Sequence, residues 1–209
     1  MVRRSLIRRF WRDDSGLALT EALLTIPIVL IALAAMVEFG VAVFQWNQAT
    51  KAVQIGARRA AVSSPIVGDV AYASLGDFSS SGALSGDPVP GIPASVSCRG
   101  ATCDTARLNR LLTGGDGVCG AVGSGFVGMC DVAPFLSADN VMVTYHRSFL
   151  GYVGRPYGQV STVTVELRDV TVDFLLIDTL LGIDSITIPS QPVSMTSEDL
   201  CDTSTICEY

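Results

Sequence analysis

The chain has 209 residues, of which 14 are Lys or Arg, 20 are Asp or Glu and one is His. Five of the basic and two of the acidic residues lie in the first 16 positions. Residues 17–209 therefore carry 9 basic and 18 acidic side chains. A chain this acidic lacks the basic surface that neutralises phosphates, which argues against nucleic-acid binding. The length suits one folded domain with an anchor rather than two independent cores.

The N-terminal region combines a basic leader with a long apolar run. The leader, residues 1–16, holds five arginines: Arg3, Arg4, Arg8, Arg9 and Arg12. Residues 17–37 follow, and Glu21 is their only charged side chain. About 20 apolar residues span a bilayer as a helix, and arginine before the run favours a cytoplasmic N-terminus. We predict a single-pass anchor in the lipid bilayer of the cytoplasmic membrane, with the C-terminal part exported.

Three interpretations of this N-terminus compete. A secretory signal would be cleaved after Ala32-Leu33-Ala34, but apolar residues continue beyond that point to Phe44. A plain signal anchor would place Glu21 at the cytoplasmic boundary, with its carboxylate reaching the headgroups. The third interpretation is a leader cut between Gly16 and Leu17, because glycine before the scissile bond and glutamate at the fifth mature position resemble a prepilin peptidase site.

Glu21 is the residue on which the third interpretation depends. A carboxylate inside a membrane segment costs about 2–3 kcal/mol at the helix centre and less near its end, so it usually has a partner or a function. Cleavage after Gly16 would create an ammonium at Leu17, about 6 Å along the same helix. In an assembled bundle, the carboxylate of one subunit can then neutralise the amine of its neighbour.

Beyond the apolar run the helix is expected to continue to about residue 62. Asn47, Lys51, Gln54 and Arg58 form a polar stripe at helical spacing. Trp46, Ala49, Val53, Gly56 and Ala60 form an apolar stripe. The sequence at 63–65, Ser-Ser-Pro, is a helix stop. The small residues of this segment permit close approach of neighbouring helices or packing on the chain's own domain, and both remain open.

The rest of the chain predicts an α+β domain. Residues 63–97 are rich in Ser, Gly and Pro and predict an irregular connector, with the domain following at 98–209. A short helix is expected from Asp104 to Leu112, closed by glycine at 114 and 115. Alternation predicts strands at 141–147, 163–167 and 170–174, with a turn or bulge at 168–169. An apolar helical turn at 175–181 and a last strand through Ile183, Ile186 and Ile188 complete a small antiparallel sheet.

The cysteines lie beyond the apolar run, on the side predicted to be exported. They are Cys98, Cys103, Cys119, Cys130, Cys201 and Cys207. An even number in an oxidising compartment favours disulfides, and their spacings lack the C-x2-C pairs typical of zinc sites. We predict three intramolecular disulfides, with Cys98–Cys103 and Cys201–Cys207 favoured by their short loops, although six cysteines allow 15 pairings.

Two apparent motifs carry little chemistry. Residues 123–128 match G-x-G-x-x-G, but they lie between two cysteines and follow no strand pattern. His146 is the only histidine and stands at a polar strand position. We find no catalytic constellation and no metal-ligand cluster, so we expect neither an enzyme nor a cofactor.

Several blocks of the sequence resemble one known family. The N-terminal blocks are residues 14–27, DSGLALTEALLTIP, residues 37–40, VEFG, and residues 55–61, IGARRAA. The C-terminal blocks are residues 141–145, 150–154, 163–165 and 196–200. Together they are similar to the TadE/TadG-like pseudopilins of tight-adherence (Tad, or Flp-type) pilus systems.

This resemblance implies a minor pilin-like subunit of the inner membrane that is matured by a prepilin peptidase. Its expected partners are other pilin-like subunits and the inner-membrane pilus assembly platform, with roles in assembly, adhesion or secretion. Ala22 follows Glu21 where some pilins of these systems have Tyr, so the chain looks less like a major pilin. The alternatives are an uncleaved single-pass binding or adhesin module and, third, an exported enzyme.

Overall fold

The computed structural model describes residues 15–120, 125–155, 159–174, 178–179, 182, 185–189 and 191–197. The chain divides into two units, and the first includes helix α2 as far as Val43. The second contains residues 44–172 and those from 186 onward, and we call it the sheet domain. Most of the leader, most of the helical turn expected at 175–181, Cys201 and Cys207 lie outside the described residues.

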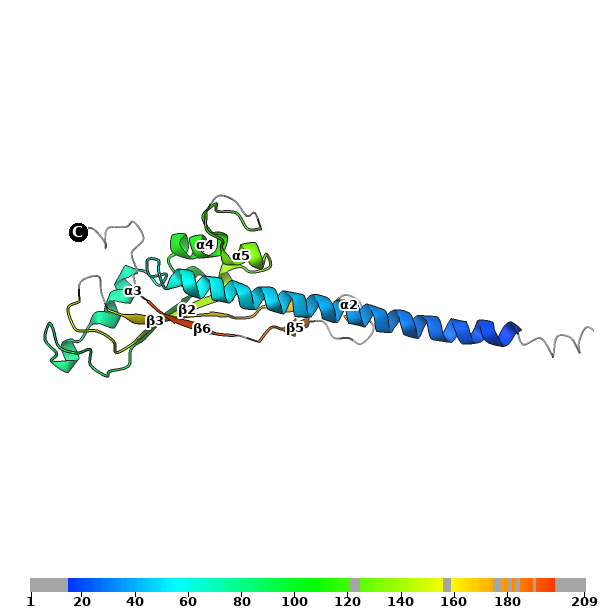
Figure 1. The fold of residues 1–209 in the computed structure, drawn as a ribbon, viewed down its shortest axis with the longest axis horizontal. Coiled ribbons are helices and arrows are strands. Elements are labelled where there is room, and N and C mark those ends of the chain that lie inside the picture. The colour runs from blue at the N-terminus through cyan, green and yellow to red at the C-terminus, as the bar shows by residue number, and fades with distance from the viewer. Residues whose placement is uncertain are drawn as a thin grey trace, which may run out of the picture. The chain divides into compact units, whose positions relative to one another are not determined.

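Helix α2 runs from Ser15 to Ala60, 46 residues that include Pro27 (Figure 1). Arg58 and Arg59 occupy its last turn, where positively charged side chains stabilise the negative end of the helix dipole. The side chain of Ser63 donates a hydrogen bond to the main-chain oxygen of Arg59. Pro65 follows in a non-helical segment, so the helix ends two residues before the expected residue 62.

The sheet domain is built on a four-stranded antiparallel sheet in the order β1-β2-β3-β6. Its strands are β1 (Ser95–Arg99), β2 (Val141–Arg147), β3 (Ser161–Leu167) and β6 (Val193–Thr196). Val143 pairs with Val165, and both are fully buried, as alternation predicts for one face of a half-buried sheet. Strands β4 (Thr171–Asp173) and β5 (Ser185–Thr187) form a second, two-stranded sheet.

Short helices lie between α2 and β1 and between β1 and β2. They are α3 (Asp69–Ala73), α4 (Thr105–Thr113), α5 (Met129–Val132) and the 3-10 turns η1 (Ser74–Gly76), η2 (Ser79–Ser81), η3 (Gly100–Thr102) and η4 (Ala138–Asn140). Asp104 caps α4 by accepting hydrogen bonds from the amides of Ala106 and Arg107. Gly114 ends it with a positive φ of 74°. Together with the long apolar helix, the sheet and two disulfides, these elements confirm the predicted α+β class.

Residues 63–97, whose composition predicted an irregular connector, contribute several buried side chains to the core of the sheet domain. Ile66, Leu75 and Phe78 are buried, and β1 begins at Ser95. The segment is fastened by Arg147, which is only 6% exposed. Its guanidinium donates to three main-chain oxygens, those of Leu75 at 2.9 Å, Ile92 at 2.8 Å and Asp77 at 3.1 Å. The guanidinium also lies over the Phe78 ring, 4.4 Å from its centroid.

Candidate membrane anchor and the end of helix α2

The first part of α2 has the character of a membrane segment. It is the one helix among the described residues that is long and apolar enough to cross a bilayer. Every Leu, Ile, Val, Met and Phe from Leu19 to Phe44 is exposed in the isolated chain, as expected of side chains that face lipid or neighbouring helices. The predicted membrane helix is therefore consistent with a single-pass protein.

The predicted processing and assembly residues lie at the beginning of this helix. Gly16 and Leu17 are in its first turn, although the side chains of residues 15–18 are not described. Glu21 is exposed, and its main-chain oxygen accepts a hydrogen bond from the Thr25 hydroxyl at 2.9 Å. Helical spacing puts Leu17 and Glu21 on one side of α2, one turn apart. Cleavage after Gly16 and a role for Glu21 in assembly remain predictions.

The last part of α2 packs on its own domain. Ala49, Val53, Gly56 and Ala60 are buried, as the predicted apolar stripe requires, whereas Trp46 is 41% exposed. The predicted polar stripe, Asn47, Lys51, Gln54 and Arg58, is exposed. Helix α2 approaches α5 closely at Gly56, where an added Cβ would lie 2.6 Å from the Met129 sulfur. The sequence left open whether this segment approaches neighbouring helices or packs on its own domain, and the structure shows the packing on its own domain.

Replacing Gly56 with Val is expected to lower the free energy of unfolding of the sheet domain. The branched side chain must displace the fully buried Met129, and overpacking of this kind costs about 1–3 kcal/mol. Thermal unfolding of the purified full-length chain measures the change. Gly40→Val is the matched control, because a Cβ there meets no atom within 4 Å. Gly56→Val with Met129→Ala should recover part of the loss, and equal effects at both glycines would contradict this account.

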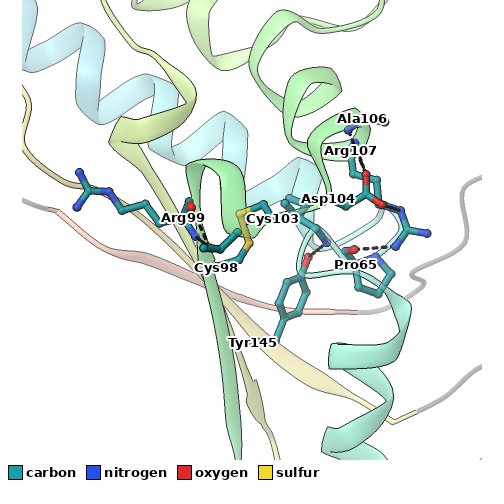
Figure 2. The surroundings of a disulfide bond; sticks show 10 residues. Pro65, Cys98, Arg99, Cys103, Asp104, Ala106, Arg107 and Tyr145 are labelled. Carbon is teal, nitrogen blue, oxygen red and sulfur yellow. Dashed lines mark hydrogen bonds and ion pairs between the residues drawn. A yellow bond between two sulfur atoms is a disulfide. The ribbon is translucent and has the colours of Figure 1, made fainter.

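The chain that leaves α2 is fixed to the sheet directly after Pro65, beside Tyr145 and Asp104 (Figure 2). The Ile66 amide donates to the Tyr145 hydroxyl at 3.0 Å, and the Ile66 oxygen accepts from the Asp104 amide at 2.8 Å. Asp104 directly follows Cys103, which is disulfide-bonded to Cys98 on β1. Tyr145 is fully buried on β2, and burial raises the pKa of its hydroxyl above the ordinary value. Both polar groups of the Ile66 backbone are thus held by the sheet and the cap of α4.

An ion pair reinforces the same region. The Arg107 guanidinium on α4 contacts both carboxylate oxygens of Asp69, at 2.7 and 2.8 Å, and the main-chain oxygen of Pro65 at 2.8 Å. Hydrogen bonding to Arg107 holds the pKa of Asp69 below its ordinary value. The pair therefore adds stability above the usual carboxyl range and loses it as the pH falls through the lowered pKa. Because the Asp69 side chain is 44% exposed, solvent screening keeps this contribution small.

A second disulfide closes the region beside α5. Cys119 and Cys130 are bonded, and Cys130 is fully buried. Nearby, the Arg59 guanidinium lies over the Phe126 ring at 3.3 Å from its centroid, with Arg110 at 5.5 Å from the same centroid. These contacts attach the end of α2 to the cysteine-bracketed loop. All cysteines in the described part of the chain are therefore in disulfides, whereas the predicted Cys201–Cys207 pair lies outside it.

The remaining candidates give little chemistry. His146 is exposed on β2. Within the described ranges, no group of three or more His, Cys, Asp or Glu gathers in a way that could hold a metal ion. An open groove of about 580 Å³ lies along α4, lined mainly by apolar residues such as Leu108, Leu112 and Ala138. Four of the six residues of the G-x-G-x-x-G segment, 125–128, are described, and they precede the four-residue α5.

Sequence reasoning missed Arg147 and Tyr145 as determinants of this region. Both lie in phase with Val141 and Val143 on the predicted strand, so alternation already placed them on the inward face. An arginine at an inward position indicates a set of buried acceptors, because its five N–H donors need partners there.

Comparison with known proteins gives one match. The family model described as TadE-like protein matches residues 16–58. This range contains Gly16, Leu17 and Glu21 and nearly all of α2. It confirms, over the N-terminal helix, the resemblance that the sequence blocks indicated. The search of curated proteins and the search of solved structures each found no match.

Proposed function

From the TadE-like match over residues 16–58, we propose that this chain is a minor pilin-like subunit, a pseudopilin, of a Tad-type pilus assembly or secretion system. The match and the exposed apolar helix support a Tad-associated membrane protein of pilin-like character. The single observation that carries the proposal is that the family segment coincides with the helix that bears Gly16, Leu17 and Glu21. Its proposed location is the inner membrane, with the N-terminus in the cytoplasm and the sheet domain exported.

The proposed maturation is cleavage between Gly16 and Leu17 by a prepilin peptidase. Glycine before the scissile bond leaves space for the enzyme at that position, and the new N-terminus is the ammonium of Leu17. This charge lies one helical turn from Glu21, at an end of the apolar segment where water solvates both groups poorly. The two disulfides and the buried core of the sheet domain suit the oxidising side of the membrane.

Assembly is proposed to occur through α2. In a staggered bundle, the Glu21 carboxylate of one subunit pairs with the Leu17 ammonium of its neighbour, while the exposed apolar side chains pack together. The proposed partners are other pilin-like subunits and the inner-membrane assembly platform. Small residues along α2, including Gly40, permit the close helix approach that such a bundle needs.

The mature wild-type chain is expected to begin at Leu17. Mass spectrometry or N-terminal sequencing of protein recovered from its host membranes gives the result directly. Gly16→Leu is expected to leave the leader attached, because its side chain crowds the scissile bond. A wild-type N-terminus at Met1 would favour the uncleaved binding or adhesin module, and one at Ala35 would favour a secretory signal. Either result would exclude the pseudopilin maturation.

Glu21→Ala is expected to abolish co-isolation with partner subunits while membrane insertion and the fold of the sheet domain stay intact. A subunit without this carboxylate leaves its neighbour's ammonium without a partner in a poorly solvated position. Glu21→Gln keeps the shape and removes the charge, so it should fail in the same way. Thr25→Ala, one turn along the helix, is the control for a local change. Normal co-isolation of Glu21→Ala would rule out the charge pair.

A further inference from the structure

Strands β1 and β6 are the two edges of the four-stranded sheet. The hydrogen bond from Arg147 N to Ala94 O sets the phase of the β1–β2 ladder. Antiparallel pairs alternate between bonded and non-bonded, so the N–H and C=O groups of Ser95 and Ser97 point away from β2. The bond from Ser197 N to Ser161 O sets the β3–β6 ladder in the same way. The backbone groups of Ser194 and Thr196 therefore point away from β3.

These outward groups are available for pairing. Among the described residues, no hydrogen bond uses the outward N–H and C=O groups of Ser95, Ser97, Ser194 or Thr196. Natural edge strands are commonly protected by charged side chains, proline or bulges. Within β6, Val193–Thr196, there is no charge and no proline, and β1 carries only Arg99 at its end. Uncharged open edges of this kind are templates for a further strand.

The two edge strands carry the same kinds of side chain on each face of the sheet: apolar on the inner face and small polar on the outer face. On the inner face, Val96 on β1 and Val193 and Met195 on β6 are only half-buried. On the central strands, the corresponding Tyr145, Val163 and Val165 are fully buried. On the outer face, all four outward residues are exposed serines or threonines. A strand added at either edge would cover the inner apolar side chains.

We propose that the partner at each edge is a second copy of this chain, with β6 of one copy paired to β1 of the next. Strand directions alternate across the order β1-β2-β3-β6, so β6 and a following β1 are antiparallel when the two copies share one orientation. In one register the outward N–H and C=O groups of both strands form hydrogen bonds with each other. This register sets Thr196 opposite Ser95 of the second copy and Ser194 opposite Ser97. Met195 then lies opposite Val96 on the inner face. The contact is head-to-tail and can repeat from copy to copy.

This contact is weak by itself and depends on copies being held side by side. Its two bonded pairs supply about four backbone hydrogen bonds, each with a small net contribution in water. Anchoring in one bilayer raises the effective concentration of neighbouring sheet domains, so a weak edge contact becomes populated. In this respect the proposal rests on the membrane anchor of the proposed function, but it needs no leader cleavage.

Disulfide cross-linking of the full-length chain in membranes tests the register. Ser95→Cys with Thr196→Cys places two thiols on exposed positions that are separated within one copy by three strand spacings, about 14 Å. An intramolecular disulfide cannot span this distance, whereas the proposed pair brings the two Cα atoms to about 5.5 Å. Oxidation is expected to give dimers and a ladder of larger species on non-reducing gels. When Ser95→Cys and Thr196→Cys are carried by separate chains expressed together, oxidation should give dimers only. Either single variant alone should give no more cross-linked product than the unchanged chain.

Two matched controls decide the interpretation. Ser95→Cys with Ser194→Cys shifts one thiol by two residues, about 7 Å along the strand, and should cross-link at least five-fold less. Ser194→Lys added to the first pair should lower its yield, whereas His146→Lys, exposed on the same face of a central strand, should not. Equal yields from both thiol pairs, or no ladder above background, would overturn the proposal. Because uncleaved chains should also cross-link, a failure here is distinguishable from a failure of maturation at Leu17.

Discussion

Arg147→Met is expected to lower the free energy of unfolding of the sheet domain by about 3 kcal/mol, because the hydrogen bonds of Arg147 are charge-assisted and largely shielded from water. The substitution keeps much of the side-chain volume but leaves the main-chain oxygens of Leu75, Ile92 and Asp77 without this donor. For a domain of this size, the loss corresponds to a fall in melting temperature of about 10 °C. Thermal or urea unfolding of the full-length chain in detergent measures it.

Arg168→Met is the matched control for this change. The Arg168 side chain is 49% exposed and pairs with Glu166, so its removal should alter stability by less than about 1 kcal/mol. Arg147→Lys should recover only part of the loss, since one ammonium cannot reproduce the planar fork that reaches three carbonyl groups. If the Arg147→Met variant were as stable as the unchanged chain, the segment 75–92 would have to be held by other contacts.

Removing the Cys98–Cys103 disulfide, by Cys98→Ser with Cys103→Ser, is expected to cost about 2 kcal/mol of unfolding free energy. The effect should extend to the end of α2. Cys103 precedes Asp104, whose amide holds the Ile66 oxygen and whose carboxylate caps α4. Hydrogen exchange should therefore become faster at the Ile66 amide, which donates to the Tyr145 hydroxyl at 3.0 Å in the intact protein.

The second disulfide provides the control for this experiment. Cys119→Ser with Cys130→Ser opens a longer loop and should cost about 3 kcal/mol, but without selective loss of protection at Ile66. A general loss of stability raises exchange throughout the domain, whereas a local one appears first around Ile66. Unchanged protection at Ile66 in the Cys98/Cys103 variant, or the same pattern in both variants, would contradict the local role of the first disulfide.

Much of the architecture could be read from local sequence pattern. Strand β2 has the predicted bounds, Val141–Arg147, because strict alternation is decided by the residues themselves. Helix α4 was predicted to within a residue by its aspartate cap and closing glycine. The turn expected at 168–169 is present, with Asp169 at a positive φ of 54°. The side-chain Nδ2 of Asn140 donates to the main-chain oxygens of both residues.

The missed strands were β1 and β6. Each is short and lies among serines and prolines, so its local composition resembles a loop. What makes them strands is pairing with the neighbouring strands β2 and β3, which lie far away in the sequence. Short edge strands have weak patterns of their own, because tertiary contacts supply most of their stability.

By itself the sequence determined the properties that depend on residues close together in the chain. These are the apolar span, the Gly16–Leu17 and Glu21 pattern, the amphipathic end of α2 and the alternation of the central strands. Only the tertiary structure decided which disulfide partners meet around α5, that Arg147 fastens residues 75–92, and that β1 and β6 are the edges of the sheet within the described part of the chain. The reason is physical: periodicity fixes which face a residue occupies, whereas its partner across the fold is set by packing between distant segments.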